Sequence, residues 1–143
     1  MKLLFLLPLF FQTHSKFLFA NPDTIIIDTY EVRLAPWPIS MKRIIGETDT
    51  CYYLEFRDQH VMNHIALKVM EFEKLEQLKY FEKGLSYLKT GNTGDIAQFE
   101  NYSIKKVSAK KDDAWYILSF GEAITNFQLP QANRMINIIK KLE

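Results

Sequence analysis

The feature that most constrains the fold is a change of hydrophobic period that occurs twice along the chain. In residues 73–89 apolar side chains recur every three or four positions, as on an amphipathic helix. These side chains are Leu75, Leu78, Phe81, Leu85 and Leu88. The closing segment, FQLPQANRMINIIKKLE, repeats this spacing and has Pro130 in its first turn, where a helix tolerates proline. Other stretches alternate apolar and polar residues, as strands do. We therefore expect strands and two helices.

Several stretches have the composition and alternation of strands. They are rich in β-branched and aromatic residues and are bounded by turn-forming residues. These stretches are residues 23–34, 42–50, 51–58, 64–72 and 99–120, the last of which holds two strands joined at KKDD. The alternation in residues 64–72 places Ile65, Leu67 and Val69 on one face of their strand.

Two further segments are expected to connect elements. APWPIS (residues 35–40) contains two prolines and predicts an extended connector, and GEAITNFQ (residues 121–128) is interpreted as a spacer before the closing helix. Gly84 interrupts the first predicted helix at a cost of about 1 kcal/mol relative to Ala. It marks either a close packing point against a strand or a position of neutral drift.

The order of these elements predicts the fold class. Strands joined by short turns pair antiparallel with their neighbours, and helices with one apolar stripe cover a sheet. We therefore predict an α+β fold with a single antiparallel sheet of about five or six strands and two amphipathic helices on one face. A gapless shift that places Leu78 on Leu129 and Leu67 on Leu118 suggests a ββα pseudo-repeat. The alternative is that any two strand–strand–helix units of similar length align in this way.

The first twenty residues, MKLLFLLPLFFQTHSKFLFA, have the pattern of a secretory signal peptide. One Lys precedes an apolar run that is too short to span a bilayer, and Ala20 offers a cleavage site. The alternatives are cleavage after Ser15, a first β-strand and an uncleaved membrane anchor. We expect a cleaved signal peptide at 1–20, a single α+β domain at 21–143 without a transmembrane span, and a secreted or periplasmic location.

The charge balance argues against a strongly basic or acidic function. The chain has 18 Lys+Arg and 17 Asp+Glu, and loss of Lys2 and Lys16 with the signal peptide leaves 16 against 17, a formal charge of −1. Such a chain has no global attraction to nucleic acid or to an anionic membrane. A single-stranded nucleic-acid binder, using the strand YSIKKVSAKK, is the alternative only if the N-terminal segment is not an export signal.

No pattern for nucleophilic or metal chemistry stands out. Cys51 is the only cysteine, which excludes an intramolecular disulfide, and nearby Asp49 disfavours a thiolate, so we expect a structural thiol. His60 and His64 are four residues apart but lie between two predicted strands and lack the glutamate of the zinc-protease motif. They are interpreted as part of a solvated hairpin turn, so we expect no metal ligands.

Catalytic and cofactor motifs are not recognisable either. Asp112 and Asp113 in KKDDAW fit a polar turn, and no glycine-rich run has the spacing of a phosphate loop. We therefore expect no catalytic residues and no cofactor, and we favour a protein that is not an enzyme. Carboxylates that are distant in the sequence but pair in the fold leave no sequence pattern, so acid–base catalysis stays an alternative.

Two tryptophans are the candidate contact residues. Trp37 lies between two prolines in the extended connector, and Trp115 follows the KKDD turn at the start of a strand. Each ring either anchors its segment to the domain through burial or is exposed to meet a partner.

Together these features predict an exported, non-catalytic interaction or accessory module that contacts another protein or an envelope component. The main alternative is a carrier of a small apolar ligand held between sheet and helices, because 14% of the residues are aromatic and many lie on predicted strand faces.

Overall fold

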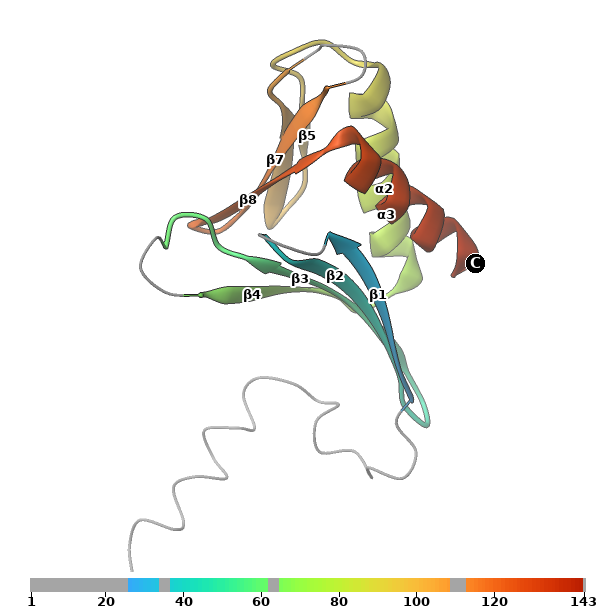
Figure 1. The fold of residues 1–143 in the computed structure, drawn as a ribbon. Helices are drawn as coiled ribbons and strands as arrows, with labels where there is room; N and C mark the ends of the chain where they lie inside the picture. Colours follow the sequence, from blue (N-terminus) through green and yellow to red (C-terminus); the bar gives the residue numbers. More distant parts are fainter. Residues whose placement is uncertain (1–25, 34–36, 62–64, 109–112, 143) are drawn as a thin grey trace, which may run out of the picture.

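The computed structural model describes residues 26–33, 37–61, 65–108 and 113–142. Four strands followed by a helix occur twice along the chain (Figure 1). The first set is β1 (Ile26–Arg33), β2 (Ile39–Ile45), β3 (Thr50–Arg57), β4 (Leu67–Phe72) and α2 (Leu75–Thr90). The second set is β5 (Ile96–Gln98), β6 (Tyr102–Lys106), β7 (Trp115–Phe120), β8 (Ala123–Gln128) and α3 (Leu129–Lys141).

The strands form two antiparallel sheets of four strands each, in the orders β1-β2-β3-β4 and β5-β6-β7-β8. Each strand pairs with its neighbour in the sequence, as short connections favour. The α+β class and the antiparallel pairing are therefore confirmed. The prediction of a single sheet of five or six strands is wrong, because α2 separates β4 from β5 and the two strands do not pair.

Three strands account for the difference from the prediction. β8 occupies most of the expected spacer, and its buried residues, Ala123, Thr125 and Phe127, alternate with half-buried ones. The polar residues Thr125 and Asn126 weaken the alternation of apolar and polar residues that indicates a strand. β5 has only three residues, and β2 begins directly after Pro38, inside the expected connector.

The two helices are amphipathic, as predicted, but they do not share one face of one sheet. They pack against each other, and α2 contacts β5 and β6 of the second sheet as well as β3 and β4 of the first (Figure 1). α3 contacts β8 and, across the molecule, β1. Each helix therefore lies against the first strand of the other half. The buried helical residues are Leu78, Phe81, Leu85, Leu88, Ala132, Met135, Ile136 and Ile139.

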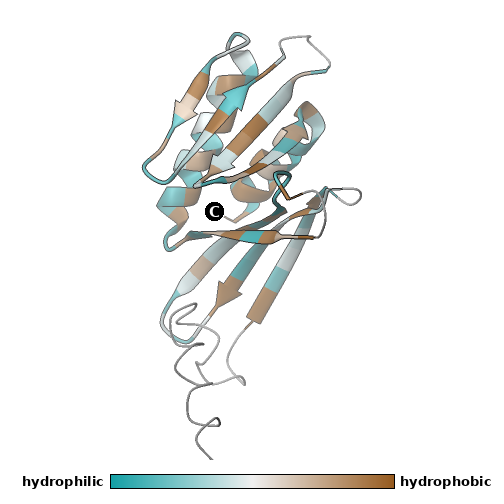
Figure 2. Ribbon diagram, turned by 90° about the vertical axis from the view of Figure 1, so that its left-hand side faces the viewer, coloured by the Kyte–Doolittle hydropathy of each residue, from teal (hydrophilic) through white to brown (hydrophobic). Residues whose placement is uncertain are grey.

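A continuous hydrophobic core joins both sheets to both helices. Hydrophobic and hydrophilic residues alternate along strands of the two sheets (Figure 2), which directs one set of side chains inward. Phe72 of β4, Phe81 of α2 and Tyr102 of β6 form an aromatic cluster with ring centroids 5.6 to 6.1 Å apart. This cluster connects the first sheet to the second through α2.

The pseudo-repeat is present in the element order but not as a gapless alignment. A shift that places Leu85 on Ile136 and Leu88 on Ile139 superposes buried positions of α2 and α3. The same shift places β4 on residues 118–123, the end of β7 and the following turn, whereas the strand that precedes α3 is β8. At this shift the buried positions of the two helices coincide, whereas the strands of the two halves align only when gaps are introduced.

The outer edge of β8 is tied to the first sheet. The amide of Gln59 donates to the carbonyl of Ile124 at 2.8 Å, and the Ile124 amide donates to Asp58 Oδ1 at 3.2 Å. Arg33 Nη1 donates to the carbonyl of Asn126 at 2.8 Å. These bonds connect residues that are 65 positions apart (Gln59 and Ile124) to 93 positions apart (Arg33 and Asn126) in the chain, and they fix how the two sheets meet.

Candidate functional site

The two predicted contact residues lie apart from the main hollow of the molecule. Trp37 is half-buried, and the guanidinium carbon of Arg57 lies 4.4 Å from its ring centroid, in a cation–π arrangement. Trp115 is half-buried at the start of β7, where it pairs with Gln128. A contact with a partner through either ring stays a prediction.

The other residues singled out in the sequence form no cluster in the described part of the chain. His60 is exposed, and its Nδ1 lies 2.6 Å from the carbonyl of Glu122, while His64 lies outside the described residues. Asp113 is exposed and Asp112 lies outside the described residues. Among the residues that the structure describes, no group of three His, Cys, Asp or Glu side chains is placed to hold a metal ion.

Cys51 is buried, as expected for a structural thiol. Burial raises the pKa of the Cys51 thiol, and the negative charge of Glu71 raises it further, against a hydrogen bond from Tyr53 that lowers it. A raised thiol pKa reduces the thiolate fraction at neutral pH, which makes Cys51 a weak nucleophile.

One lysine of the strand proposed for nucleic-acid binding has a structural role. Lys106 is only 4% exposed, and its Nζ donates to the carbonyls of Lys89 at 3.1 Å and Gly91 at 2.8 Å. These carbonyls belong to the end of α2, where a cation is favourable. Lys106 is therefore not available for phosphate contacts.

The expected signal peptide, residues 1–20, lies outside the described residues. Within the described residues, neither helix has the length and hydrophobicity needed to cross a membrane.

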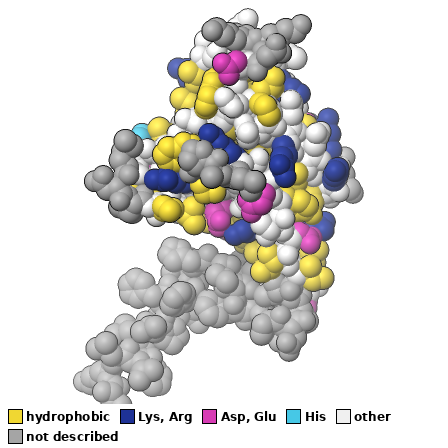
Figure 3. Space-filling view, viewed as in Figure 1, with side chains coloured by type: hydrophobic (Ala, Val, Ile, Leu, Met, Phe, Trp, Pro, Cys, Tyr) yellow, Lys and Arg dark blue, Asp and Glu magenta, His cyan; other side chains and the backbone are white. Residues whose placement is uncertain are grey.

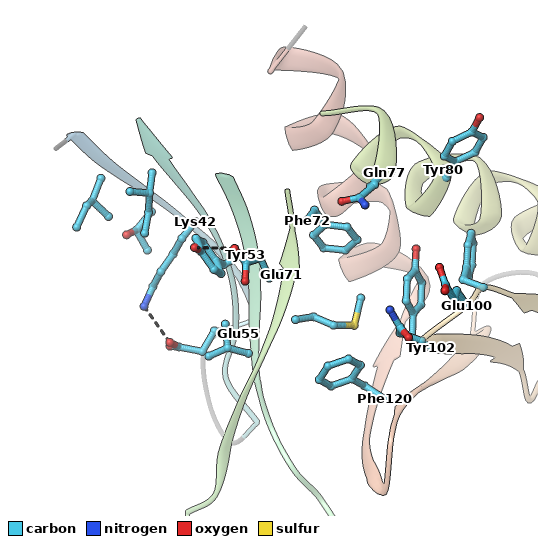
Figure 4. Close-up of a pocket in the computed structure, with 17 residues that line it drawn as sticks. Lys42, Tyr53, Glu55, Glu71, Phe72, Gln77, Tyr80, Glu100, Tyr102 and Phe120 are labelled. Atoms are coloured by element: carbon cyan, nitrogen blue, oxygen red, sulfur yellow. Dashed lines mark hydrogen bonds and ion pairs between the residues drawn. The ribbon is translucent and has the colours of Figure 1, made fainter. Parts of the chain in front are cut away.

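A hollow of about 1090 Å³ surrounds the strand β4 (Figure 4), and we call it the β4 hollow. Its outer limb lies on the face of the first sheet that points away from the helices. The outer limb is lined by Ile27, Thr29, Lys42, Ile44, Tyr53, Glu55, Val69 and Glu71. Its aromatic limb lies on the other side of β4, toward α2 and the second sheet. The aromatic limb is lined by Met70, Phe72, Gln77, Tyr80, Phe99, Glu100, Asn101, Tyr102 and Phe120.

The alternation of β4 explains why one strand lines both limbs. Successive side chains of a strand point to opposite faces. Val69 and Glu71 therefore line the outer limb, whereas Met70 and Phe72 line the aromatic limb and are buried. Figure 4 shows Glu71 and Phe72 on opposite sides of β4.

The outer limb carries two polar pairs. Lys42 Nζ forms an ion pair with Glu55 Oε2 at 3.0 Å, and the Tyr53 hydroxyl donates to Glu71 Oε1 at 3.2 Å (Figure 4). Since Lys42 is paired with Glu55, the carboxylates of Glu71 and of Glu100 in the aromatic limb give the hollow a net negative charge.

The aromatic limb is held in place by ring packing. Phe99 stacks on Tyr102 with centroids 4.3 Å apart and ring planes 15° apart, and Tyr102 in turn contacts the ring of Phe72. Burial raises the pKa of the Tyr102 phenol, so its hydroxyl stays protonated at physiological pH. The rings of this limb therefore present an uncharged, mostly apolar surface, and the one carboxylate among its described lining residues is that of Glu100.

β4 also brings apolar side chains to the surface. Leu67 is 52% exposed and Val69 48% exposed, and Ile65, just before the strand, is 69% exposed. Hydrophobic side chains come to the surface over the first sheet, including the end where β4 begins (Figure 3). Isolated exposed apolar residues are common, but neighbouring ones beside a hollow are typical of a binding surface.

Sequence reasoning missed this site, although one signal was present. The stretch ALKVMEF is apolar on both faces, with Leu67 and Val69 on one and Met70 and Phe72 on the other. A strand that is half-buried in its own domain needs only one apolar face. The second apolar face could have indicated a contact with another molecule.

Comparison with known proteins identifies no relative: no protein-family model, no curated protein and no solved structure matches this chain. The β4 hollow offers apolar contact, aromatic surface and negative charge, which are means of binding.

Proposed function

We propose that the protein is a non-catalytic interaction module that acts outside the cytoplasm and binds another protein through β4 and the β4 hollow. The observation that carries this proposal is the exposed apolar pair Leu67 and Val69 on a strand at the edge of its sheet, beside a hollow. The export pattern of residues 1–20 supports the location, and an envelope or secreted protein is the expected partner.

A capture experiment tests this function. The full-length chain, with an affinity tag after its C-terminus, is expressed in its host, and partners are recovered from the envelope and secreted fractions. The same experiment uses the double variant Leu67→Lys/Val69→Lys and the matched control Ile96→Lys. Ile96 is 51% exposed on β5 and does not line the β4 hollow.

We expect the wild type and Ile96→Lys to recover the same protein. The double variant should recover at least about tenfold less, because its two lysines replace apolar contacts with charges that lose water on binding and find no partner. Equal recovery by the double variant would place the interface elsewhere. Recovery of no protein, or a full-length product in the cytoplasm by intact-mass measurement, would remove the support for an exported binding module.

A small apolar ligand is the second candidate, favoured by the aromatic limb. The space between sheets and helices, where such a ligand was expected, is filled by buried side chains such as Leu78, Phe81 and Leu85. A ligand would therefore occupy the aromatic limb instead. Native mass spectrometry of the protein isolated from its host distinguishes the two functions, since an apoprotein mass alone argues against a carrier.

A further inference from the structure

The two sheets have four edge strands, and three of them are protected against pairing with another chain. Exposed edges present unpaired backbone groups, and proteins protect them with charges, bulges, short strands or covering segments. β1 has a register shift between Glu31 and Arg33, which interrupts its edge. β5 has only three residues. β8 and β4 differ in how their outward backbone groups are bonded.

Each outward-facing residue of β8 has at least one bonded backbone group. In an antiparallel pair only every second residue directs its N–H and C=O toward the neighbouring strand. Leu129 N donates to Ala114 O in the β7–β8 register, so Ile124, Asn126 and Gln128 point their backbone outward. Ile124 bonds to Asp58 and Gln59, the Asn126 carbonyl accepts from Arg33, and the Gln128 amide donates to Gln131 Oε1.

The same alternation shows which groups of β4 face outward. Asp58 N donates to Ala66 O at 2.8 Å, in register with the pairing of Leu54 with Met70. Lys68, Met70 and Phe72 therefore bond to β3, whereas Leu67, Val69 and Glu71 direct their N–H and C=O groups to the free edge. Among the described residues, no strand pairs with this edge, and no hydrogen bond involves the backbone of these three residues.

We propose that β4 binds its partner by strand addition, so that an extended peptide segment of the partner becomes a fifth strand of the first sheet. This inference rests on the proposed function and specifies its mode. Backbone bonds to Leu67, Val69 and Glu71 hold the added strand, and its alternate side chains enter the two limbs of the β4 hollow. The hollow lies on both faces of β4, as this arrangement requires.

The lining defines the chemistry of the peptide. Side chains that enter the aromatic limb meet Phe72, Tyr102 and Phe120, which favours apolar or aromatic residues. Glu71 and Glu100 favour a Lys or Arg on the peptide. A second copy of this chain is disfavoured as the added strand, because its β4 would bring another glutamate, Glu71, to a hollow that already has a net negative charge.

The test uses peptides selected on the full-length protein from a displayed library of random dodecapeptides. We expect a consensus with apolar residues at alternate positions and at least one Lys or Arg. The selected peptide is then synthesised in two forms, N-methylated at its odd or at its even residues. One form is expected to bind about tenfold or more weakly, and the other within about twofold of the parent, because only alternate amides of an added strand face β4.

A backbone variant of β4 provides the matched test. Val69→Pro removes an N–H at the free edge of β4 without removing a hydrogen bond to β3, and edge strands tolerate proline at such a position. Val69→Thr keeps both the N–H and the β-branched shape. We expect about tenfold weaker peptide binding for Val69→Pro and less than about threefold for Val69→Thr. If Val69→Pro does not fold, the two methylated peptides decide the question on the wild-type protein.

Three outcomes would overturn the inference. The first is that no peptide is enriched, and the second is that both methylated forms bind like the parent. The third is a homodimer, seen by light scattering, that Val69→Pro dissociates, since the added strand would then be a second copy. The capture experiment with Leu67→Lys/Val69→Lys is independent of all three, so strand addition can fail while the interaction function stands.

Discussion

Gly84 lies where α2 packs closely against β5 and the residue that follows it. A Cβ atom at this position would lie 2.5 Å from Cζ of Phe99 and 3.2 Å from Cβ of Ala97. Phe99 cannot move freely, because its ring stacks on Tyr102. The close-packing interpretation of Gly84 is therefore confirmed: the glycine allows α2 to approach β5 and the start of the aromatic limb.

We predict that Gly84→Ala destabilises the protein by up to about 2 kcal/mol, measured by urea unfolding. Overpacking typically costs about 1–3 kcal/mol, which outweighs the gain in helix propensity of about 1 kcal/mol. In a Phe99→Ala background the blocking ring is gone, and the same change should be neutral or stabilising. A stabilising effect of Gly84→Ala in the wild-type background would contradict this account.

At the scale of elements, α2 depends on a lysine from a strand that follows it. Its C-terminal carbonyls at Lys89 and Gly91 accept hydrogen bonds from the buried Lys106 of β6. An ordinary sequence signal for a helix end is a basic residue in its own last turn, and Lys89 fits that signal. The bond from Lys106 joins α2 to the second sheet and could not be read from the helix alone.

We predict that Lys106→Met lowers the free energy of unfolding by about 1.5–3 kcal/mol, the usual range for hydrogen bonds to charged groups. The neighbouring Lys105 is exposed on the same strand, so Lys105→Met is the matched control and should change stability by less than about 0.5 kcal/mol. Urea unfolding of both variants gives the comparison. Equal effects would mean that the bonds to Lys89 and Gly91 contribute little.

At the scale of the whole molecule, the junction between the sheets is held by polar groups at Asp58 and β8. The Asp58 carboxylate accepts hydrogen bonds from the amides of His60 and Ile124. Burial alone would raise the pKa of Asp58, but these two amides, together with the charges of His60 and Lys68, lower it overall. The ionised carboxylate therefore stabilises the folded state.

We predict that Asp58→Asn lowers stability at neutral pH and that the difference from wild type disappears in acid. A lowered folded pKa stabilises above the unfolded Asp pKa of about 3.9, and this contribution is lost as pH falls through the folded value. Urea unfolding at a series of pH values between neutral and acid measures the effect. Asp113→Asn, at an exposed site, should show no such pH-dependent difference, and a constant gap for Asp58→Asn would contradict the prediction.

Local periodicity predicted α2 to within two residues of its observed ends. It also predicted the strands with clear alternation, such as β3 and β7. It failed where the local signal is short or polar. β5 has three residues, and β8 includes Thr125, Asn126 and Gln128, whose pairing depends on β7 and on the distant Asp58 and Arg33. These long-range partners cannot be recognised from the local pattern of apolar and polar residues.

The sequence alone determined the α+β class, the two amphipathic helices and the antiparallel pairing of neighbouring strands, because these depend on periodicity and on short connections. Only the tertiary structure decided that the strands divide into two sheets and that Leu67 and Val69 remain exposed while Met70 and Phe72 are buried. Alternation separates the two faces of a strand but does not say which one the rest of the chain covers. That choice depends on α2 and β6, which pack on one side of β4 only.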